Sequence, residues 1–278
     1  MLAHYTATKA AHMPALDVII PCYNAADTLA AAAESALAQS VVQTVWLVDD
    51  ASQDDTPRLI AALAARYPNI RSLALAQNSG AAAARNWGAL NSRADCLAFL
   101  DADDAYEAEA LAPAHLALRN IPYLSLVRLK LRPAGFPERY TAHPAFSEAW
   151  QRLKMTVGGN TVFRRSVFLA VGGFPQDALF RRFGGEDAAL GIALTRSAVV
   201  GTLFGSEDAA VIHRYRTGIH AERLLDAALF GIAPEGMTAQ HQAEAEAVTQ
   251  RICDTLGSLK TTLAFPQTGI TALRADYA

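Results

Sequence analysis

Four apolar segments in the first 105 residues end in polar residues at nearly equal spacing. The endings lie near Asn24, Asp50, Gln77 and Asp101, at intervals of 26, 27 and 24 residues. Each interval is long enough for one strand and one helix of about three turns, and this alternation predicts βαβ units with a parallel sheet. Right-handed crossovers bring the carboxyl ends of such strands to one edge of the sheet. We therefore expect a ligand site at that edge.

The apolar runs and the turn residues give the expected elements. In the first half, strands are expected over residues 16–20, 44–48, 70–75 and 96–100, and helices over 27–39, 57–67 and 80–89. Thr56 is expected to cap the second helix, with Pro57 at its first position. The second half is less regular, with a strand over 123–131, a loop over 132–144, mixed signals over 162–171, a helix over 186–197, a late strand over 209–215 and an amphipathic helix over 239–259.

Composition excludes several classes of protein. The hydrophobic fraction of 52% is enough for a sizeable core, and the net charge of −3 gives no basic surface for nucleic acid. Cys22, Cys96 and Cys253 are far apart, without metal-ligand spacing and without any sign of an oxidising compartment. No window of about 18 apolar residues predicts a transmembrane segment, and the first 15 residues do not resemble a signal peptide. We expect a cytoplasmic protein, with peripheral membrane association as an open alternative.

Three carboxylates follow the buried strand over 96–100. Asp101, Asp103 and Asp104 stand where open α/β sheets bind ligands. Hard carboxylate oxygens in that place suit Mg²⁺ or Mn²⁺ bound to a diphosphate. The alternative is a solvated acidic turn.

These segments resemble the family 2 glycosyltransferases, which use nucleotide-diphosphate sugars. The resemblance, in order and spacing, rests on Val18–Asn24, Val48–Ser52, Asn78–Gly80 with Arg85-Asn86, Asp101–Asp104, Gly172–Pro175, Phe183–Asp187 and, more weakly, Ala209–His213. The second half is similar to the branch that includes polypeptide N-acetylgalactosaminyltransferases and chondroitin-type polymerases. The resemblance implies the GT-A fold, an α/β architecture with a Rossmann-like, mostly parallel sheet flanked by helices.

The resemblance also suggests a domain organisation. A GT-A domain is expected over residues 1–220, made of a nucleotide-binding half (1–105) and an acceptor-side half (106–220). A helical C-terminal extension is expected over 221–278. Its amphipathic helix could serve the interface of a homodimer.

The resemblance assigns nucleotide binding to the strand ends and the turns after them. The implied residues are Pro21, Tyr23, Asn24, Asp50, Gly80, Arg85, Asp101 and Ala102. Asp50 would accept a hydrogen bond from the uracil N–H, and Arg85 would contact the nucleotide or its phosphates. The alternatives are a plain turn at 21–24, a helix cap at Asp50 and a surface salt bridge at Arg85.

The metal and the chemistry are assigned in the same way. Asp103 and Asp101 would bind Mn²⁺ or Mg²⁺, with His213 as a third ligand and His220 as its rival. Asp187 matches the aspartate that deprotonates the acceptor hydroxyl in inverting members. Glu186 would orient the acceptor or the sugar, and Asn160 would line the sugar pocket. The alternative for the acidic pair is a set of helix N-terminal carboxylates.

The expected function is a metal-dependent glycosyltransferase that moves a hexose or N-acetylhexosamine from a UDP-sugar to a hydroxyl. The acceptor could be a glycan, a lipid or a protein. A catalytically impaired UDP-sugar-binding protein of the same fold is the alternative. The first βα turn lacks the G-x-G-x-x-G fingerprint and the chain lacks a P-loop, which argues against a dehydrogenase and an ATPase. The Gln-x-x-Arg-Trp motif of processive members is also missing.

Overall fold

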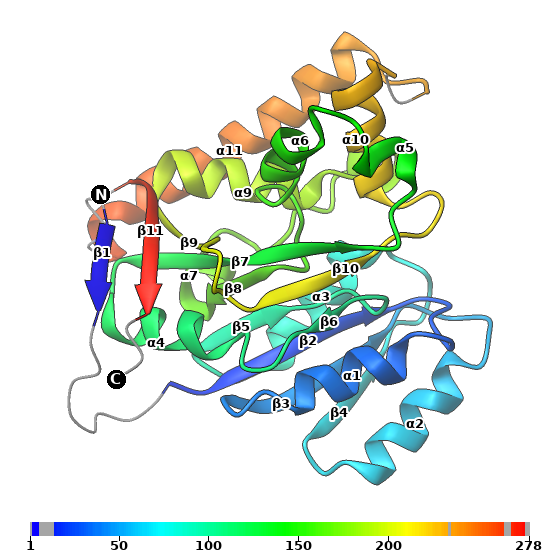
Figure 1. Cartoon of the computed structure of the whole chain (residues 1–278). Coiled ribbons are helices and arrows are strands. Elements are labelled where there is room, and N and C mark those ends of the chain that lie inside the picture. The colour runs from blue at the N-terminus through cyan, green and yellow to red at the C-terminus, as the bar shows by residue number, and fades with distance from the viewer. Residues whose placement is uncertain (1, 6–13, 233–234, 264–267, 276–278) are drawn as a thin grey trace.

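The computed structural model describes residues 2–5, 14–232, 235–263 and 268–275. Within these residues, eleven strands form a sheet in the order β1-β11-β9-β7-β8-β5-β2-β3-β4, with β10 and β6 paired off this path (Figure 1). The strands are β1 (Leu2–Tyr5), β2 (Leu16–Cys22), β3 (Val42–Asp49), β4 (Ile70–Ala74), β5 (Cys96–Phe99), β6 (Ala105–Tyr106), β7 (Leu124–Ala134), β8 (Thr161–Arg164), β9 (Val199–Leu203), β10 (Ala210–Arg214) and β11 (Gly269–Ala275).

Helices cover both faces of this sheet. They are α1 (Leu29–Leu37), α2 (Thr56–Arg66), α3 (Ala81–Asn91), α4 (Ala112–Asn120), α5 (Glu138–Thr141), α6 (Phe146–Leu153), α7 (Arg165–Ala170), α8 (Ala178–Phe183), α9 (Glu186–Ser197), α10 (His220–Phe230) and α11 (Ala239–Leu263). Val18 and Ile20 of β2 pack in a buried cluster with α1, α2 and α4, whereas Ile19 packs in a second cluster with α3, α7 and α9. A strand buried on both faces has no polar alternation, which explains the apolar run over residues 18–20.

The nucleotide-binding half has the predicted topology. β5, β2, β3 and β4 are neighbours and all parallel, with α1, α2 and α3 in the crossovers. α3 lies close to the sheet at Gly88, where an added Cβ would stand 2.6 Å from Ile19 Cγ2. The strand ends therefore meet at one edge, as the spacing predicted.

The expected loop over 132–144 is wrong in part. β7 continues to Ala134, and α5 follows at Glu138–Thr141. The last five residues of β7 pair with β10 in parallel register, from Lys130 with Ala210 to Ala134 with Arg214. Pro133 suggests a loop when only its neighbours are considered, but the distant strand β10 supplies the partners that hold this segment extended.

The expected helical C-terminal extension is present, and it also contributes a strand to the sheet. α10 and α11 are helices, but β11 returns to the central sheet and pairs in parallel with β9. β1, which was not expected, pairs in parallel with β11. Both strands are short segments far apart in the sequence, so their pairing leaves no local pattern.

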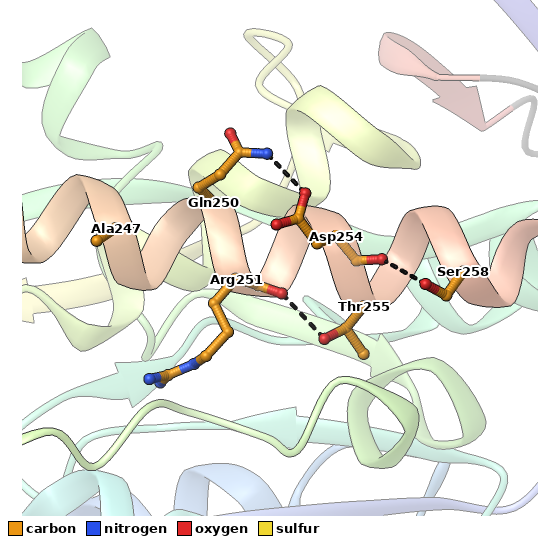
Figure 2. A pocket seen from close by; sticks show the side chains of 6 residues that line it. All are labelled: Ala247, Gln250, Arg251, Asp254, Thr255 and Ser258. Atoms are coloured by element: carbon orange, nitrogen blue, oxygen red, sulfur yellow. Dashed lines mark hydrogen bonds between the residues drawn. The ribbon is translucent and has the colours of Figure 1, made fainter.

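The apolar stripe of α11 packs against the rest of the protein. Val248, Ile252 and Leu256 are buried in the cluster that contains α9. The outward face is polar, and Figure 2 shows Gln250 donating to Asp254 and Ser258 donating to the Asp254 carbonyl. This stripe therefore packs within the chain, and the possible homodimer interface suggested from the sequence would have to use another face of α11. No helix in the described ranges is long and apolar enough to cross a membrane.

Candidate active site

A cavity of about 650 Å³ opens at the carboxyl ends of β2, β3 and β5, and residues from α8, α9 and α10 complete its lining. The residues assigned to nucleotide, metal or catalysis all line it: Pro21, Tyr23, Asn24, Asp50, Gly80, Arg85, Asp101, Ala102, Asp103, Glu186, Asp187 and His213. Asn160 and the fully buried Asp104 do not line it. Segments almost 200 residues apart in the sequence therefore meet at the predicted edge of the sheet.

The turn after β2 is tied to the end of β3. Asn24 has a positive φ of 48°, a conformation that asparagine tolerates better than most residues. Its side-chain oxygen accepts the Gln53 N–H at 2.8 Å, and its own N–H donates to Ser52 Oγ at 3.0 Å. Tyr23 is half exposed beside this turn. An aromatic face and a fixed polar turn suit a nucleoside.

Asp50 is a buried carboxylate held by backbone. One oxygen accepts the Ser79 N–H at 2.7 Å and the other accepts the Gly80 N–H at 2.8 Å. Gly80 has a φ of +90°, so a glycine suits this contact. Each carboxylate oxygen retains a further lone pair and can accept a donor from the cavity. Asp50 is not the cap of α2 that the alternative suggested, because its contacts go to the loop before α3.

Arg85 joins the two acidic motifs. Its Nη2 lies 2.5 Å from Asp101 Oδ1 and its Nη1 lies 3.5 Å from Glu186 Oε1. Only 5% of the Arg85 surface is exposed to solvent. Its guanidinium carbon lies 5.3 Å from the centre of the Phe174 ring. The alternative of a surface salt bridge is therefore wrong. Arg85 lines the cavity as a buried cation shared by two carboxylates.

This arrangement separates the pKa values of the two acids. Burial tends to raise the pKa of Asp101, but the Arg85 guanidinium outweighs burial and the pKa is lowered. Burial, together with the neighbouring Asp187, raises the pKa of Glu186 to about 7, although Arg85 opposes the shift. Pairs of acids with different pKa values are typical of catalytic sites.

His213 is oriented by Asp104. Nδ1 of the ring donates to Asp104 Oδ2 at 2.7 Å, and Asp104 Oδ1 accepts the Arg214 N–H at 3.0 Å. Nε2 of His213 is buried and has no hydrogen-bond partner in the described part of the chain. A histidine whose Nδ1 is held by a carboxylate presents its other nitrogen as a metal ligand.

The donor set fits a divalent cation in the presence of substrate oxygens. Asp101 and Asp103 line the same cavity as the free Nε2 of His213, and Asp103 also pairs with Arg216. The described residues contain no group of three or more His, Cys, Asp or Glu side chains close enough to hold a metal by themselves. Such a site is typical of Mg²⁺ or Mn²⁺ bound by few carboxylates and completed by phosphate oxygens and water.

His220, the rival of His213, also lines the cavity. It is the first residue of α10, and both of its ring nitrogens are buried without a hydrogen-bond partner among the described residues. Burial lowers its pKa, which the nearby Asp187 opposes. A neutral imidazole at this position can accept or donate one hydrogen bond to a ligand.

Asp187 stands at the first turn of α9. Its Oδ2 accepts the Gly158 N–H at 2.8 Å, and the preceding Gly185 has a φ of +98°. Asp187 also has the position that the alternative interpretation gave it, in the first turn of a helix. There its Oδ1 accepts the Ala188 N–H. The side chain nevertheless lines the cavity.

Asn160 has a structural role, and the prediction that it lines the sugar pocket is wrong. Its side chain is fully buried, and its Nδ2 donates to the carbonyls of Leu129 and Lys154. Its Oδ1 accepts from Arg128, whose guanidinium also donates to the Val157 carbonyl at 2.9 Å. Both amide hydrogens are engaged and the buried side chain does not line the cavity, so it is not placed to contact a sugar there.

The sequence interpretation missed Arg128 and the arginines of α8 and α10. Arg128 is buried beneath the loop that holds Asp187. An arginine within the apolar strand β7 was the available signal. Arg181, Arg182 and Arg223 line the cavity. The Arg-Arg pair just before Gly-Gly-Glu-Asp was the signal for two of them.

Residues 17–172, more than half of the chain, match the family model described as glycosyl transferase family 2. The chain belongs to this family. Succinoglycan biosynthesis protein ExoO of Rhizobium meliloti is 38% identical over 130 residues, which is 43% of this chain and 37% of that protein. Chondroitin synthase of Escherichia coli is 32% identical over 100 residues, 36% of this chain and 14% of the synthase. The chain thus spans well under two thirds of these relatives.

Solved structures confirm the GT-A fold. Mannosyltransferase PcManGT from Pyrobaculum calidifontis, in complex with GDP-Man and Mn²⁺, has a TM-score of 0.59 at 20% identity, over 91% of this chain and 76% of that chain. Residues 1–349 of Staphylococcus aureus TarS, in complex with UDP-GlcNAc, have a TM-score of 0.54 at 18% identity, over 89% of this chain and 74% of that chain.

Proposed function

We propose that this family 2 glycosyltransferase transfers a hexose or N-acetylhexosamine from a UDP-sugar to a hydroxyl acceptor, with help from a divalent cation. The observation that supports this most strongly is the meeting of Asp50, Asp101, Asp103, His213 and Asp187 around one cavity. Structural neighbours in complex with GDP-Man and with UDP-GlcNAc support a nucleotide-sugar donor. Residues 1–105 would bind the nucleotide and residues 106–220 the acceptor. Residues 221–278 would form a C-terminal extension that adds Arg223 to the cavity wall.

The nucleotide side of the cavity provides recognition. Asp50 accepts a donor from the base with the lone pairs that the Ser79 and Gly80 N–H groups leave free, which favours the imide N–H of uracil. Tyr23 offers its ring for stacking. Asp101, Asp103 and His213 Nε2 would hold Mn²⁺ or Mg²⁺. When bound, the cation neutralises the diphosphate and stabilises the departing UDP as a Lewis acid.

Asp187 acts as the general base in an inverting reaction. The acceptor oxygen forms a bond to the anomeric carbon from the face opposite UDP, and its proton moves to the Asp187 carboxylate. The bond from the anomeric carbon to the phosphate oxygen breaks, and UDP leaves with the electron pair. Gly158 N–H fixes one oxygen of Asp187, so the base is oriented before the acceptor arrives. Glu186 orients the acceptor beside it.

The test is a transfer assay with UDP-glucose, UDP-galactose, UDP-GlcNAc and UDP-GalNAc, with Mn²⁺ and a panel of sugar, polyol and lipid acceptors. We expect Asp187→Asn to lose transfer by about 10²- to 10⁴-fold, since asparagine keeps the contact to Gly158 but takes no proton. The exposed Asp55→Asn is the matched control. Equal UDP release by wild type and Asp187→Asn, with no transfer to any acceptor, would favour the impaired sugar-binding protein instead.

A further inference from the structure

Charge pairing divides the cavity into two regions. Near the strand ends, carboxylates have partners: Asp50 accepts backbone N–H groups, and Asp101 and Asp103 pair with arginines. On the wall from α8 and α10, Arg182 and Arg223 line the cavity and form no ion pair with any carboxylate in the described part of the chain. A guanidinium in a concave, partly enclosed site attracts an anion with matching planar geometry.

This wall also contains unsatisfied polar atoms. Both ring nitrogens of His220 and Nε of Arg223 are buried without a hydrogen-bond partner among the described residues. Buried polar atoms are almost always paired in native proteins. His220 and Arg223 lie one turn apart on α10 and together have three such atoms. These atoms indicate a bound ligand with polar groups beside this turn.

The wall lies next to the proposed base. A Cβ at Gly184 would stand 3.3 Å from Arg223 Nη2 and 3.2 Å from His220 Nδ1. Gly184, with a φ of +71°, precedes Gly185, Glu186 and Asp187 directly. A group bound by Arg223 would therefore lie close to the acceptor hydroxyl that Asp187 deprotonates.

The other three arginines of the lining have partners of their own. Arg85 pairs with Asp101 and Glu186. Arg216 pairs with Asp103 of the acidic turn after β5. Arg181 donates to the Asn78 carbonyl at 2.9 Å, in the loop before α3. Arg182 lies over the Phe183 ring at 4.9 Å, and neither it nor Arg223 makes an ion pair or a side-chain hydrogen bond of this kind with any described residue, so both guanidinium groups can bind an anion.

We propose that the acceptor of this enzyme carries an anionic group, a phosphate or a carboxylate, which Arg182 and Arg223 bind beside Asp187. The inference rests on the proposed function, because it takes Asp187 as the base. Planar guanidinium groups suit both anions, since each can accept two parallel hydrogen bonds. His220 supplies a further hydrogen bond through a ring nitrogen.

The experiment uses protein saturated with UDP and Mn²⁺, so that the donor phosphate positions are filled. Methyl glucoside, methyl glucoside 6-phosphate and methyl glucuronide are titrated into it by calorimetry. We expect at least one anionic ligand to bind roughly tenfold to a hundredfold more tightly than the neutral one. The preference between the two anions identifies phosphate or carboxylate as the acceptor group.

Two variants locate the contact. Arg223→Gln and Arg182→Gln should each remove most of the preference for the anion and change UDP affinity by less than about twofold. Arg58→Gln, an exposed arginine on α2, is the control and should keep the preference. Because Arg182 is exposed, its variant tests the contact even where Arg223→Gln disturbs folding.

Three results would overturn the inference. One is equal binding, or no binding, of the neutral and anionic ligands to the UDP-loaded protein. The second is a fall in UDP affinity in both arginine variants, which would assign the guanidinium groups to the donor. The third is a failure of the wild-type protein to bind UDP at all, which refutes the proposed function and this inference with it.

Discussion

Glu186→Gln is expected to stabilise the free protein at alkaline pH. Glu186 is partly buried beside Asp187, and desolvation raises its pKa from 4.5 to about 7. The folded state therefore holds its proton more tightly than the unfolded state. Stability falls as the pH rises from about 4.5 to about 7, and the full cost is present above pH 7. A glutamine has no proton to lose, so it avoids this cost.

The size of the effect follows from the shift. A difference of about 2.5 pKa units corresponds to roughly 3 kcal/mol above pH 7, at about 1.4 kcal/mol per unit. At pH 5 the same group costs less than about 1 kcal/mol. The gain in unfolding free energy of Glu186→Gln over wild type should thus be about 2 to 3 kcal/mol larger at pH 8.5 than at pH 5.

Urea denaturation in EDTA at these two pH values measures the difference. Glu148→Gln is the matched control, because Glu148 is exposed and pairs only with Arg152 on the same helix. We expect the control to change stability by less than about 0.5 kcal/mol at both pH values. Equal effects of Glu186→Gln at pH 5 and pH 8.5, or a loss of stability at pH 8.5, would refute the reasoning.

Two glycine substitutions and the chemical modification of two cysteines test the packing of the fold. Gly191→Ala would place a Cβ 2.2 Å from Arg128 Nη2, so thermal and urea unfolding should show a loss of roughly 1–3 kcal/mol. Gly257→Ala, with open space around it on α11, should instead be neutral or stabilising by up to about 1 kcal/mol, and equal losses at both glycines would contradict the packing. Burial raises the pKa of the Cys96 thiol to about 11 and also raises that of Cys22. Ellman's reagent at pH 8 should therefore modify these two thiols only after unfolding, and fast modification in the native protein would be the contrary result.

The nucleotide-binding half was predictable because its signals are local. The strand endings near Asn24, Asp50 and Asp101 follow apolar runs that each fit one strand, and a parallel sheet leaves one arrangement for their carboxyl ends. The roles of the acidic pair at 186–187 came from the family resemblance, and the pair lies in the first turn of α9. These residues line one cavity as expected.

The remaining features depend on contacts between distant segments. The pairing of β7 with β10, and of β11 with β1, leaves no periodic pattern in either strand. Asn160 looked like a pocket residue because it follows two glycines, yet its amide is used by Arg128 and backbone carbonyls. Arg85 is buried rather than on the surface, and its two carboxylate partners come from different motifs. Only the fold brings such partners together.

Calorimetric titration of UDP, GDP and CDP, each with Mn²⁺ and with EDTA, tests the proposed donor site most directly. For wild-type protein we predict binding that is selective for UDP and at least about tenfold tighter with Mn²⁺. Asp103→Asn should keep the preference for UDP but lose the gain from Mn²⁺. Binding of no nucleotide in either condition, or equal affinity with Mn²⁺ and EDTA, would contradict a metal-assisted UDP-sugar site at this cavity.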